Sequence, residues 1–216
     1  MVASSSVTEP ERPPDPVKDT LAYYDQHADA FVERTANLSM EHLYEPFLAL
    51  LPRGGRILDA GCGSGRDAAE FAKRGYLVTA FDGSSQMAKR ASDRTGFEVL
   101  TMRFEAVDWQ EEFEGVWASA SLLHLPSESL RPAVSRLVQA LRPDGVLFVS
   151  IKEGEFEGER EERWFTDTTP DALRELMTAS GVDVINIWST DDQRPGVTRR
   201  WINGLGRRRT AAVPDR

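Results

Sequence analysis

The sequence is poor in cysteine and histidine, and it contains no long apolar run. Its single cysteine, Cys62, rules out an intrachain disulfide, a structural zinc site built on several cysteines and the usual cysteine-ligated iron–sulfur cluster. No apolar stretch approaches the ~20 residues of a membrane-spanning helix. The first residues, MVASSSVTEPERPPDP, lack the apolar core of a secretory signal. With three histidines and scattered acidic residues there is no metal-ligand pattern, so we expect a cytoplasmic protein without a metal or a membrane partner.

Positive charge is also scarce. The chain has 26 Lys and Arg against 35 Asp and Glu, which gives a net charge of −9 with neutral His. Because Lys and Arg contacts dominate nucleic-acid affinity, this balance argues against a broad nucleic-acid-binding face. A local cluster is formed by Arg199, Arg200 and residues 207–209, which we interpret as a solvated edge and tail.

The organisation of the chain follows from its length and from the change of apolar period along it. At roughly 150 residues per domain, 216 residues predict one domain, over residues 17–206. We expect a flexible tail over 1–16, a helical lid over 17–52 and a basic C-terminal tail over 207–216. Further helices are predicted over 66–74, 84–95, 127–141 and 169–180, and strands over 56–61, 76–82, 97–102, 113–121, 146–151, 182–190 and 198–206.

Strands that alternate with helices predict right-handed crossovers and a parallel sheet. The last two strands have no helix between them, so the final strand is expected to run antiparallel. The fold class is therefore α/β, a Rossmann-like, doubly wound, mostly parallel seven-stranded sheet with an antiparallel last strand and an N-terminal helical lid. The segment 152–163, which is rich in glutamate, is interpreted as a solvated loop, with a mobile flap as the alternative.

The stretch ILDAGCGSGRD is the most informative in the chain. Gly61, Gly63 and Gly65 follow an apolar strand and open a helix, where glycine allows a tight turn and a close approach of the backbone to a ligand. Asp82 ends the next strand, where a carboxylate accepts both hydroxyls of a ribose. The nicotinamide fingerprint G-x-G-x-x-G is not met because Arg66 takes its last position, and the Walker pattern is absent.

LDAGCGSG resembles motif I of the class I S-adenosylmethionine-dependent methyltransferases. The resemblance continues through AFDGS, MRFEAVDW, GVWASASLLHLP and LVQALRPDGVLFVSIKEG and covers roughly residues 20–206. The small single-domain bacterial enzymes, methyltransferase type 11 or 12 or those resembling tellurite-resistance methyltransferases, are the nearest subgroup. These motifs are specific for the superfamily but not for a substrate.

The resemblance implies S-adenosyl-L-methionine as cofactor, with S-adenosyl-L-homocysteine as product. It places the glycines and Asp59 at the methionine part, Asp82 at the ribose and Glu105 at the adenine amino group, with Asp108 as the alternative. For the cofactor carboxylate, Tyr24, Arg34 and Arg66 are candidates that ordinary packing or solvation would also explain. The full set implied to bind the cofactor is Tyr24, Arg34, Asp59, Gly61, Cys62, Gly63, Gly65, Arg66, Asp82, Gly83, Met87, Phe104, Glu105, Ser119 and Ala120.

The methyl acceptor is expected beside the ends of the fourth and fifth strands. His124 is the candidate general base, because histidine titrates near neutrality, and a structural histidine is the alternative. Lys152, Arg163 and Trp164 are candidate substrate contacts, and Phe165 is a candidate cover of the pocket. Trp109, Trp117, Trp188 and Trp201 are interpreted as packing residues.

The leading functional hypothesis is an enzyme that methylates an O, N or S nucleophile of a small molecule. The compact chain and its acidic balance favour it, and the net charge favours a neutral or cationic acceptor. The alternatives are a methyltransferase acting on RNA or protein, a non-catalytic S-adenosylmethionine-binding module and a nicotinamide-dependent oxidoreductase. We expect a monomer or a homodimer.

Overall fold

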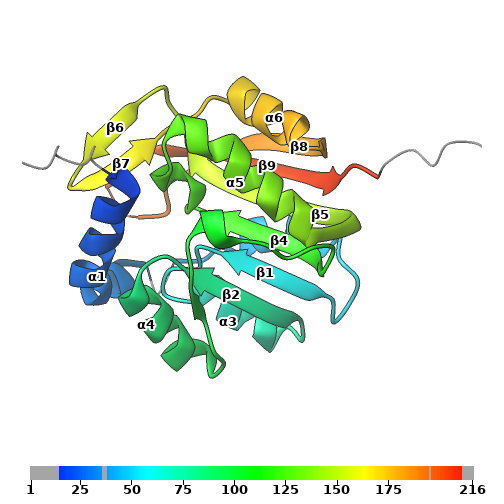
Figure 1. Cartoon of the computed structure of the whole chain (residues 1–216), viewed down its shortest axis with the longest axis horizontal. Helices are drawn as coiled ribbons and strands as arrows, with labels where there is room; N and C mark the ends of the chain where they lie inside the picture. The colour runs from blue at the N-terminus through cyan, green and yellow to red at the C-terminus, as the bar shows by residue number, and fades with distance from the viewer. Residues whose placement is uncertain (1–14, 36–37, 195, 211–216) are drawn as a thin grey trace, which may run out of the picture.

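The computed structural model describes residues 15–35, 38–194 and 196–210. Seven strands form one sheet in the order β3-β2-β1-β4-β5-β9-β8 (Figure 1). Neighbouring strands pair in parallel from β3 to β5, and β9 runs antiparallel to both β5 and β8. The predicted fold class is confirmed. In chain order the strands of the sheet are β1 (Arg56–Ala60), β2 (Leu77–Asp82), β3 (Leu100–Thr101), β4 (Phe113–Ser119), β5 (Leu141–Lys152), β8 (Val182–Asp191) and β9 (Arg200–Arg208).

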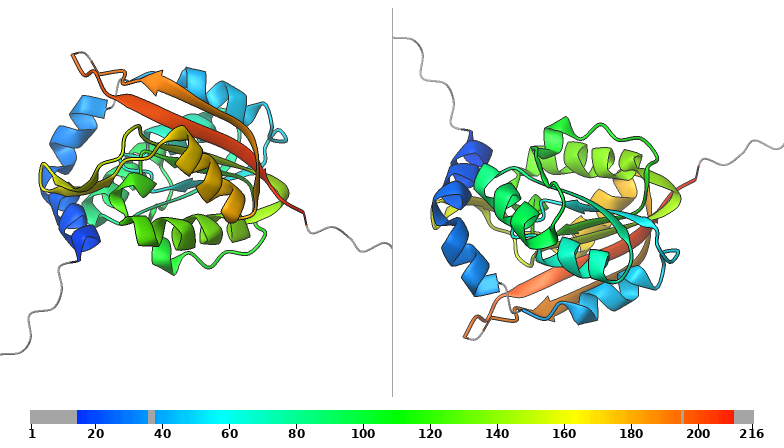
Figure 2. Two further views of the ribbon diagram at one scale, coloured as in Figure 1. Left: turned by 90° about the horizontal axis from the view of Figure 1, so that it is seen from above. Right: turned by 90° about the horizontal axis from the view of Figure 1, so that it is seen from below.

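Helices cover both faces of the sheet because successive side chains of each strand point to opposite faces. Leu58 of β1 packs in the cluster that includes α5 and α6, whereas Ile57 packs with α2 and α3 on the other face (Figure 2). The second cluster is aromatic, and the rings of Trp117 and Phe148 stack there with centroids 3.9 Å apart. The helices are α1 (Pro16–Thr35), α2 (Glu41–Leu48), α3 (Arg66–Lys73), α4 (Ser85–Thr95), α5 (Ser127–Ala140) and α6 (Pro170–Ala179), with short 3-10 turns η1 (Phe104–Ala106) and η2 (Leu122–His124).

Helix α1 lies at one end of the sheet, beside α4 and the strand β7 (Arg163–Thr166) (Figure 1). Hydrogen bonds fix it on both sides. The Asp25 carboxylate accepts from the Ser84 hydroxyl at 2.6 Å, and the Thr20 hydroxyl accepts from the Trp164 amide at 2.9 Å. Within the helix, the backbone of His27 is not helical and produces a kink. Helix α2, in contrast, packs against the sheet, with Phe47 fully buried.

The structure departs from the predicted elements at several places, and the fifth strand begins at Leu141 and not at the predicted residue 146. The glutamate-rich segment contains a hairpin, β6 (Glu157–Arg160) with β7 (Arg163–Thr166), and is not a plain loop. The third strand shrinks from the predicted 97–102 to two residues. The last strand continues to Arg208, so the predicted basic tail starts inside the sheet.

The remaining parts of the two predicted tails, residues 1–14 and 211–216, lie outside the described residues. Among the helices that the structure describes, none combines the length and the apolarity needed to cross a bilayer.

Candidate functional site

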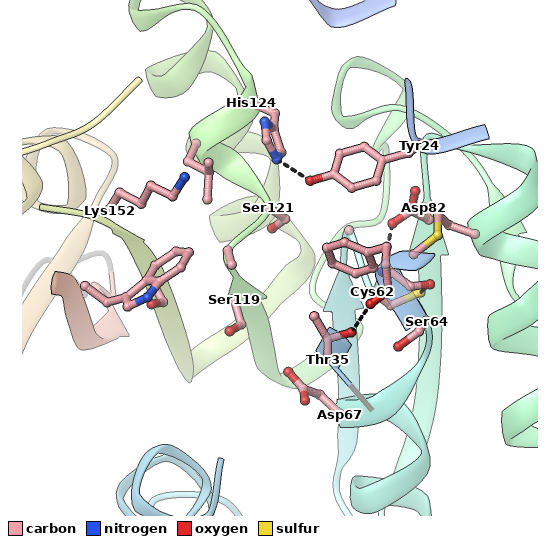
Figure 3. A pocket seen from close by; sticks show the side chains of 18 of the residues that line it. Tyr24, Thr35, Cys62, Ser64, Asp67, Asp82, Ser119, Ser121, His124 and Lys152 are labelled. Carbon is pink, nitrogen blue, oxygen red and sulfur yellow. Dashed lines mark hydrogen bonds between the residues drawn. The ribbon is translucent and has the colours of Figure 1, made fainter. Parts of the chain in front are cut away.

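A cavity of about 540 Å³ opens at the carboxyl ends of β1, β2, β4 and β5, beneath α1. Open parallel sheets bind ligands at the carboxyl ends of their strands, at the point where the strand order reverses. In this sheet that point lies between β1 and β4, because β2 and β3 follow β1 on one side and β5 follows β4 on the other. One end of the cavity is formed by the loop 61–65 with Asp59 and Asp82, and we call it the loop end. The other, the Lys152 end, is formed by His124, Lys152, Arg163, Phe165 and residues 190–194 and 196–199. Figure 3 shows Lys152 and His124 on the side of the cavity opposite Asp82.

The loop end requires glycine at two positions for different reasons. Gly61 has φ +75°, and a Cβ built on it would lie 2.5 Å from the Cβ of Ser121. Gly65 has φ +70° and precedes α3, and its Cβ would lie 2.9 Å from the backbone of Ala91 in α4. Gly61 therefore allows the loop to lie against Ser121, while Gly65 allows two helices to approach each other.

Asp82 holds the loop in place through backbone hydrogen bonds. One carboxylate oxygen accepts from the Gly63 amide at 2.8 Å, and the other accepts from the Ser84 amide at 2.9 Å. Burial nevertheless dominates and raises the pKa of Asp82 to about 6. A ligand that donates hydrogen bonds to this carboxylate would stabilise its charged form.

Asp59 places a second carboxylate at the loop end of the cavity. Its side chain is 3 % exposed, and its Oδ2 atom is buried without a hydrogen-bond partner among the described residues. Burial raises the pKa of Asp59 well above its usual range, and the nearby Asp67 adds to the shift. Because buried polar atoms in native proteins are almost always paired, Asp59 indicates a place where a donor of a ligand would bind.

Arg66 reaches the cavity wall but is already engaged. Its Nε donates to the Asp67 carboxylate at 2.6 Å, which also accepts from the Tyr44 hydroxyl at 2.6 Å and from the Trp117 indole at 2.8 Å. Burial opposes ionisation of Asp67, but Arg66 and these hydrogen bonds hold its pKa below the usual value. Arg66 is thus a fixed cation on the cavity wall, and its Nη1 also donates to the Thr35 carbonyl at 3.5 Å.

The four residues that the resemblance places around the adenine, Gly83, Met87, Phe104 and Glu105, line the loop end of the cavity. Gly83 lies under α1, since a Cβ there would be 2.7 Å from the Leu21 side chain. Glu105 pairs with Arg103 at 2.9 Å. Asp108, the alternative to Glu105, is exposed and is not among the lining residues.

His124 is enclosed by hydrogen bonds. Its Nδ1 lies 2.7 Å from the Trp164 carbonyl oxygen, so that nitrogen carries the proton, and Nε2 then accepts from the Tyr24 hydroxyl at 2.8 Å (Figure 3). Burial lowers the pKa of His124 to about 3. Both ring nitrogens are occupied and the ring resists protonation, an arrangement that fits the alternative of a structural histidine better than a general base.

At the Lys152 end, one aromatic ring is surrounded by cations. Phe165 lies 3.7 Å from Lys152 Nζ and 5.2 Å from the Arg163 guanidinium, measured to the ring centroid. Lys152 is 7 % exposed. Its burial, with Arg199 and Arg160 nearby, lowers its pKa to about 7.

Most predicted site residues line this cavity, and three do not. Arg34 is exposed on α1, and Gly65 serves the contact between α3 and α4. Trp164 contributes its backbone to Thr20 and His124, while its indole donates to Thr166 at 3.1 Å. These are corrections to the predicted contacts. The other predicted residues lie on the wall, namely Tyr24, Asp59, Gly61, Cys62, Gly63, Arg66, Asp82, Gly83, Met87, Phe104, Glu105, Ser119, Ala120, His124, Lys152 and Arg163.

The sequence interpretation missed the connection between β8 and β9. Residues 190–194 and 196–199 line the cavity, as does Trp201, which had been interpreted as a packing residue. One signal was available. An antiparallel last strand makes the preceding strand end at the same sheet edge as β1 and β4, so the connection must lie beside the cavity.

Comparisons with known proteins agree with this geometry. Residues 57–145 match the model of a family described as a methyltransferase domain. Malonyl-[acyl-carrier protein] O-methyltransferase of Salmonella typhimurium is 32% identical over 136 residues, 61% of this chain and 50% of that protein. Trans-aconitate 2-methyltransferase of Deinococcus radiodurans is 33% identical over 110 residues, 48% of this chain and 41% of that protein. The chain spans about half the length of the curated relatives it matches.

A solved structure shares the fold. The 1,6-didemethyltoxoflavin-N1-methyltransferase of Burkholderia thailandensis, crystallised with 1,6-didemethyltoxoflavin and S-adenosylhomocysteine, superposes with a TM-score of 0.74. The match covers 94% of both chains at 23% identity.

Proposed function

Because the chain belongs to the class I S-adenosylmethionine-dependent methyltransferases, we propose that it transfers the methyl group of S-adenosylmethionine to a small-molecule acceptor. The observation that carries the proposal is the single cavity that joins the loop end to the Lys152 end beneath α1. An enzyme of this kind needs both partners in one water-poor space, because alignment of the reacting atoms supplies most of the rate.

The loop end suits the cofactor in its charges and in its shape. The buried, unpaired Oδ2 of Asp59 is an acceptor for an ammonium group, and Asp82 is an acceptor for a ribose diol. Arg66 offers a fixed cation to a carboxylate. Met87 and Phe104 supply apolar surface for a purine, and Gly61 lets the loop lie directly against Ser121.

The bound cofactor supplies a methyl group already activated on a sulfonium, which leaves as a neutral thioether. The chain's own residues therefore have mainly to orient the acceptor and exclude water. Tyr24 closes the roof by donating to His124, and His124 is fixed by the Trp164 carbonyl. We assign this pair a role in shaping the wall, with no proton transfer through His124.

The contacts of the C-terminal arginines favour a small-molecule acceptor over RNA. Arg207 donates to the Asp144 carbonyl at 2.7 Å, while Arg208 and Arg209 pair with Glu111 and Asp183 at 2.9 and 3.0 Å. These side chains already have partners and do not form a free basic face. The trans-aconitate and didemethyltoxoflavin enzymes are named for small-molecule acceptors, in keeping with the proposal. A cytoplasmic location and a monomeric or homodimeric state stay predictions.

Calorimetry with S-adenosylhomocysteine tests the cofactor site. We expect Asp82→Asn to weaken binding about 100-fold, because charge-assisted hydrogen bonds contribute about 1.5–3 kcal/mol each. Asp108→Asn is the matched control and should bind like the natural protein, since Asp108 lies outside the cavity wall. Equal binding by Asp82→Asn would reject the assigned site, and binding of NAD in place of S-adenosylhomocysteine would reject the proposed reaction.

A further inference from the structure

Four cationic side chains line the Lys152 end, namely Lys152, Arg163, Arg194 and Arg199. They come from β5, from β7 and from the connection between β8 and β9, so three separate segments bring positive charge to one place. A smaller hollow of about 270 Å³ adjoins this end, and its lining adds Arg160 and Arg200 together with their ion-pair partners Asp167 and Glu153.

Not all of these cations are neutralised by acidic neighbours. Arg163 pairs with Glu161 at 2.7 Å, and Arg194 pairs with Asp192 at 2.6 Å. Among the described residues, neither Lys152 nor Arg199 makes an ion pair with a carboxylate. Two positive side chains therefore face the cavity without a counter-ion.

Lys152 is the more informative of the two because it is 7 % exposed. Its ammonium contacts the face of Phe165 at 3.7 Å, a weaker partner than an anion. In Figure 3 its side chain points toward His124, on the side of the cavity opposite Asp82. A buried, unpaired cation is costly unless a counter-charge is supplied.

We infer that the methyl acceptor is a small organic acid, and that its carboxylate binds between Lys152 and Arg199 at the end of the cavity opposite Asp82. This inference rests on the proposed function and names the acceptor's chemical class. It differs from the expectation of a neutral or cationic acceptor, which used the net charge of −9. The charges that line the cavity, and not those of the whole chain, face the ligand.

The surroundings of Lys152 link carboxylate binding to a proton. Arg199, Arg160 and Arg163 face Lys152 and disfavour its charged form, while Asp167 favours it and His124 is neutral. The pKa of Lys152 without ligand is about 7. A carboxylate beside it raises that pKa, so binding above pH 7 takes up a proton.

The first test compares acids with their neutral amides on protein saturated with S-adenosylhomocysteine. Benzoate and phenylacetate are the charged probes, and benzamide and phenylacetamide are their matched neutral forms. We expect the acids to bind at least tenfold more tightly than the amides at pH 6.5. Lys152→Met should remove that difference without changing the affinity for S-adenosylhomocysteine, while Lys73→Met, on the exposed side of α3, should leave it intact.

The second test measures proton uptake at pH 8 by calorimetry of benzoate binding in phosphate and in Tris. We expect close to one proton per benzoate for the natural protein. Lys152→Arg should bind benzoate with no proton uptake, because arginine stays charged.

Two results would overturn the inference, namely amides that bind as tightly as the acids, or acids that fail to bind the loaded protein. Failure to bind S-adenosylhomocysteine at all would instead count against the proposed function, so the two failures are distinguishable.

Discussion

At the loop end of the cavity the structure depends on main-chain geometry, whereas at the Lys152 end it depends on long charged side chains. The loop end has left-handed glycines and a carboxylate held by two backbone amides. The Lys152 end gathers its cations from β5, a hairpin and a connection between strands. Main-chain geometry tolerates few sequences, while side chains of this kind can be exchanged on the same backbone. One fold can thus keep its cofactor and change its acceptor.

The largest effect is expected from breaking the loop end by Gly61→Ala. The added Cβ would lie 2.5 Å from Ser121 at φ +75°, so strain and overpacking together should cost about 2–5 kcal/mol. We expect a lower free energy of unfolding in urea and no measurable binding of S-adenosylhomocysteine.

Gly75→Ala is the matched control for this change. Gly75 also has a positive φ, +88°, but no atom lies within 4 Å of the added Cβ. It should lose about 1–2 kcal/mol and bind the cofactor normally. Equal loss of binding in both variants would show that the close approach at Gly61 is unimportant.

A second prediction uses pH to weaken the loop end alone. Asp82 has a pKa of about 6, so its carboxylate becomes protonated as the pH falls from 7 to 5. The affinity for S-adenosylhomocysteine should then fall by up to tenfold per pH unit. A raised carboxyl pKa makes the ligand-free fold gain stability as the pH falls through 6, so unfolding at Asp82 does not explain the loss.

Calorimetry at several pH values measures this dependence. In Asp82→Asn the residue no longer titrates, so the affinity for S-adenosylhomocysteine should change less with pH between pH 7 and pH 5. A slope that persists in that variant would assign the titration to another group.

A third prediction affects the Lys152 end. Tyr24→Phe removes the hydroxyl that donates to His124 Nε2 and accepts from Arg163. A buried acceptor left without its donor costs about 1–3 kcal/mol, which urea unfolding would detect, while the affinity for S-adenosylhomocysteine should change less than threefold (roughly 0.6 kcal/mol). Tyr23→Phe is the control, since the Tyr23 ring, and not its hydroxyl, contacts Arg163. A cofactor affinity that falls together with stability would show that Tyr24 belongs to the loop end as well.

The smallest effect is expected for Arg34→Ala. Arg34 is exposed and lies on neither end of the cavity, so stability should change by less than about 0.5 kcal/mol. Calorimetry should give an unchanged affinity for S-adenosylhomocysteine. A tenfold loss would restore the predicted cofactor contact.

The same contrast explains which parts of the site could be predicted from the sequence. Gly61 and Gly63 follow one apolar strand, and Asp82 ends the next. The left-handed backbone of the loop favours glycine, and the two backbone amides at Asp82 favour a carboxylate, so both residue types can be recognised in the sequence. Lys152 was a candidate because it ends a strand. Arg194 and Arg199 were missed because they lie in a connection whose conformation no short-range pattern specifies. His124 was found at the right place, but its pKa depends on Trp164 and Tyr24, which are distant in sequence.

The fold shows a similar division. Strands β1 and β4 were predicted because each is an apolar run buried on both faces. The hairpin of β6 and β7 was missed because its first strand consists of glutamate, glycine and arginine, residues without the alternation that marks a strand. The hairpin forms a two-stranded sheet of its own, and its strand β7 lies next to α1.

Helix α1 covers both ends of the cavity. Leu21 lies against Gly83 at the loop end, and Tyr24, one turn later, is bonded to His124 at the Lys152 end. If the helix lifts away, it uncovers both ends at the same moment. A ligand exchanged by displacing α1 would therefore expose the ligand at the other end to solvent at the same time.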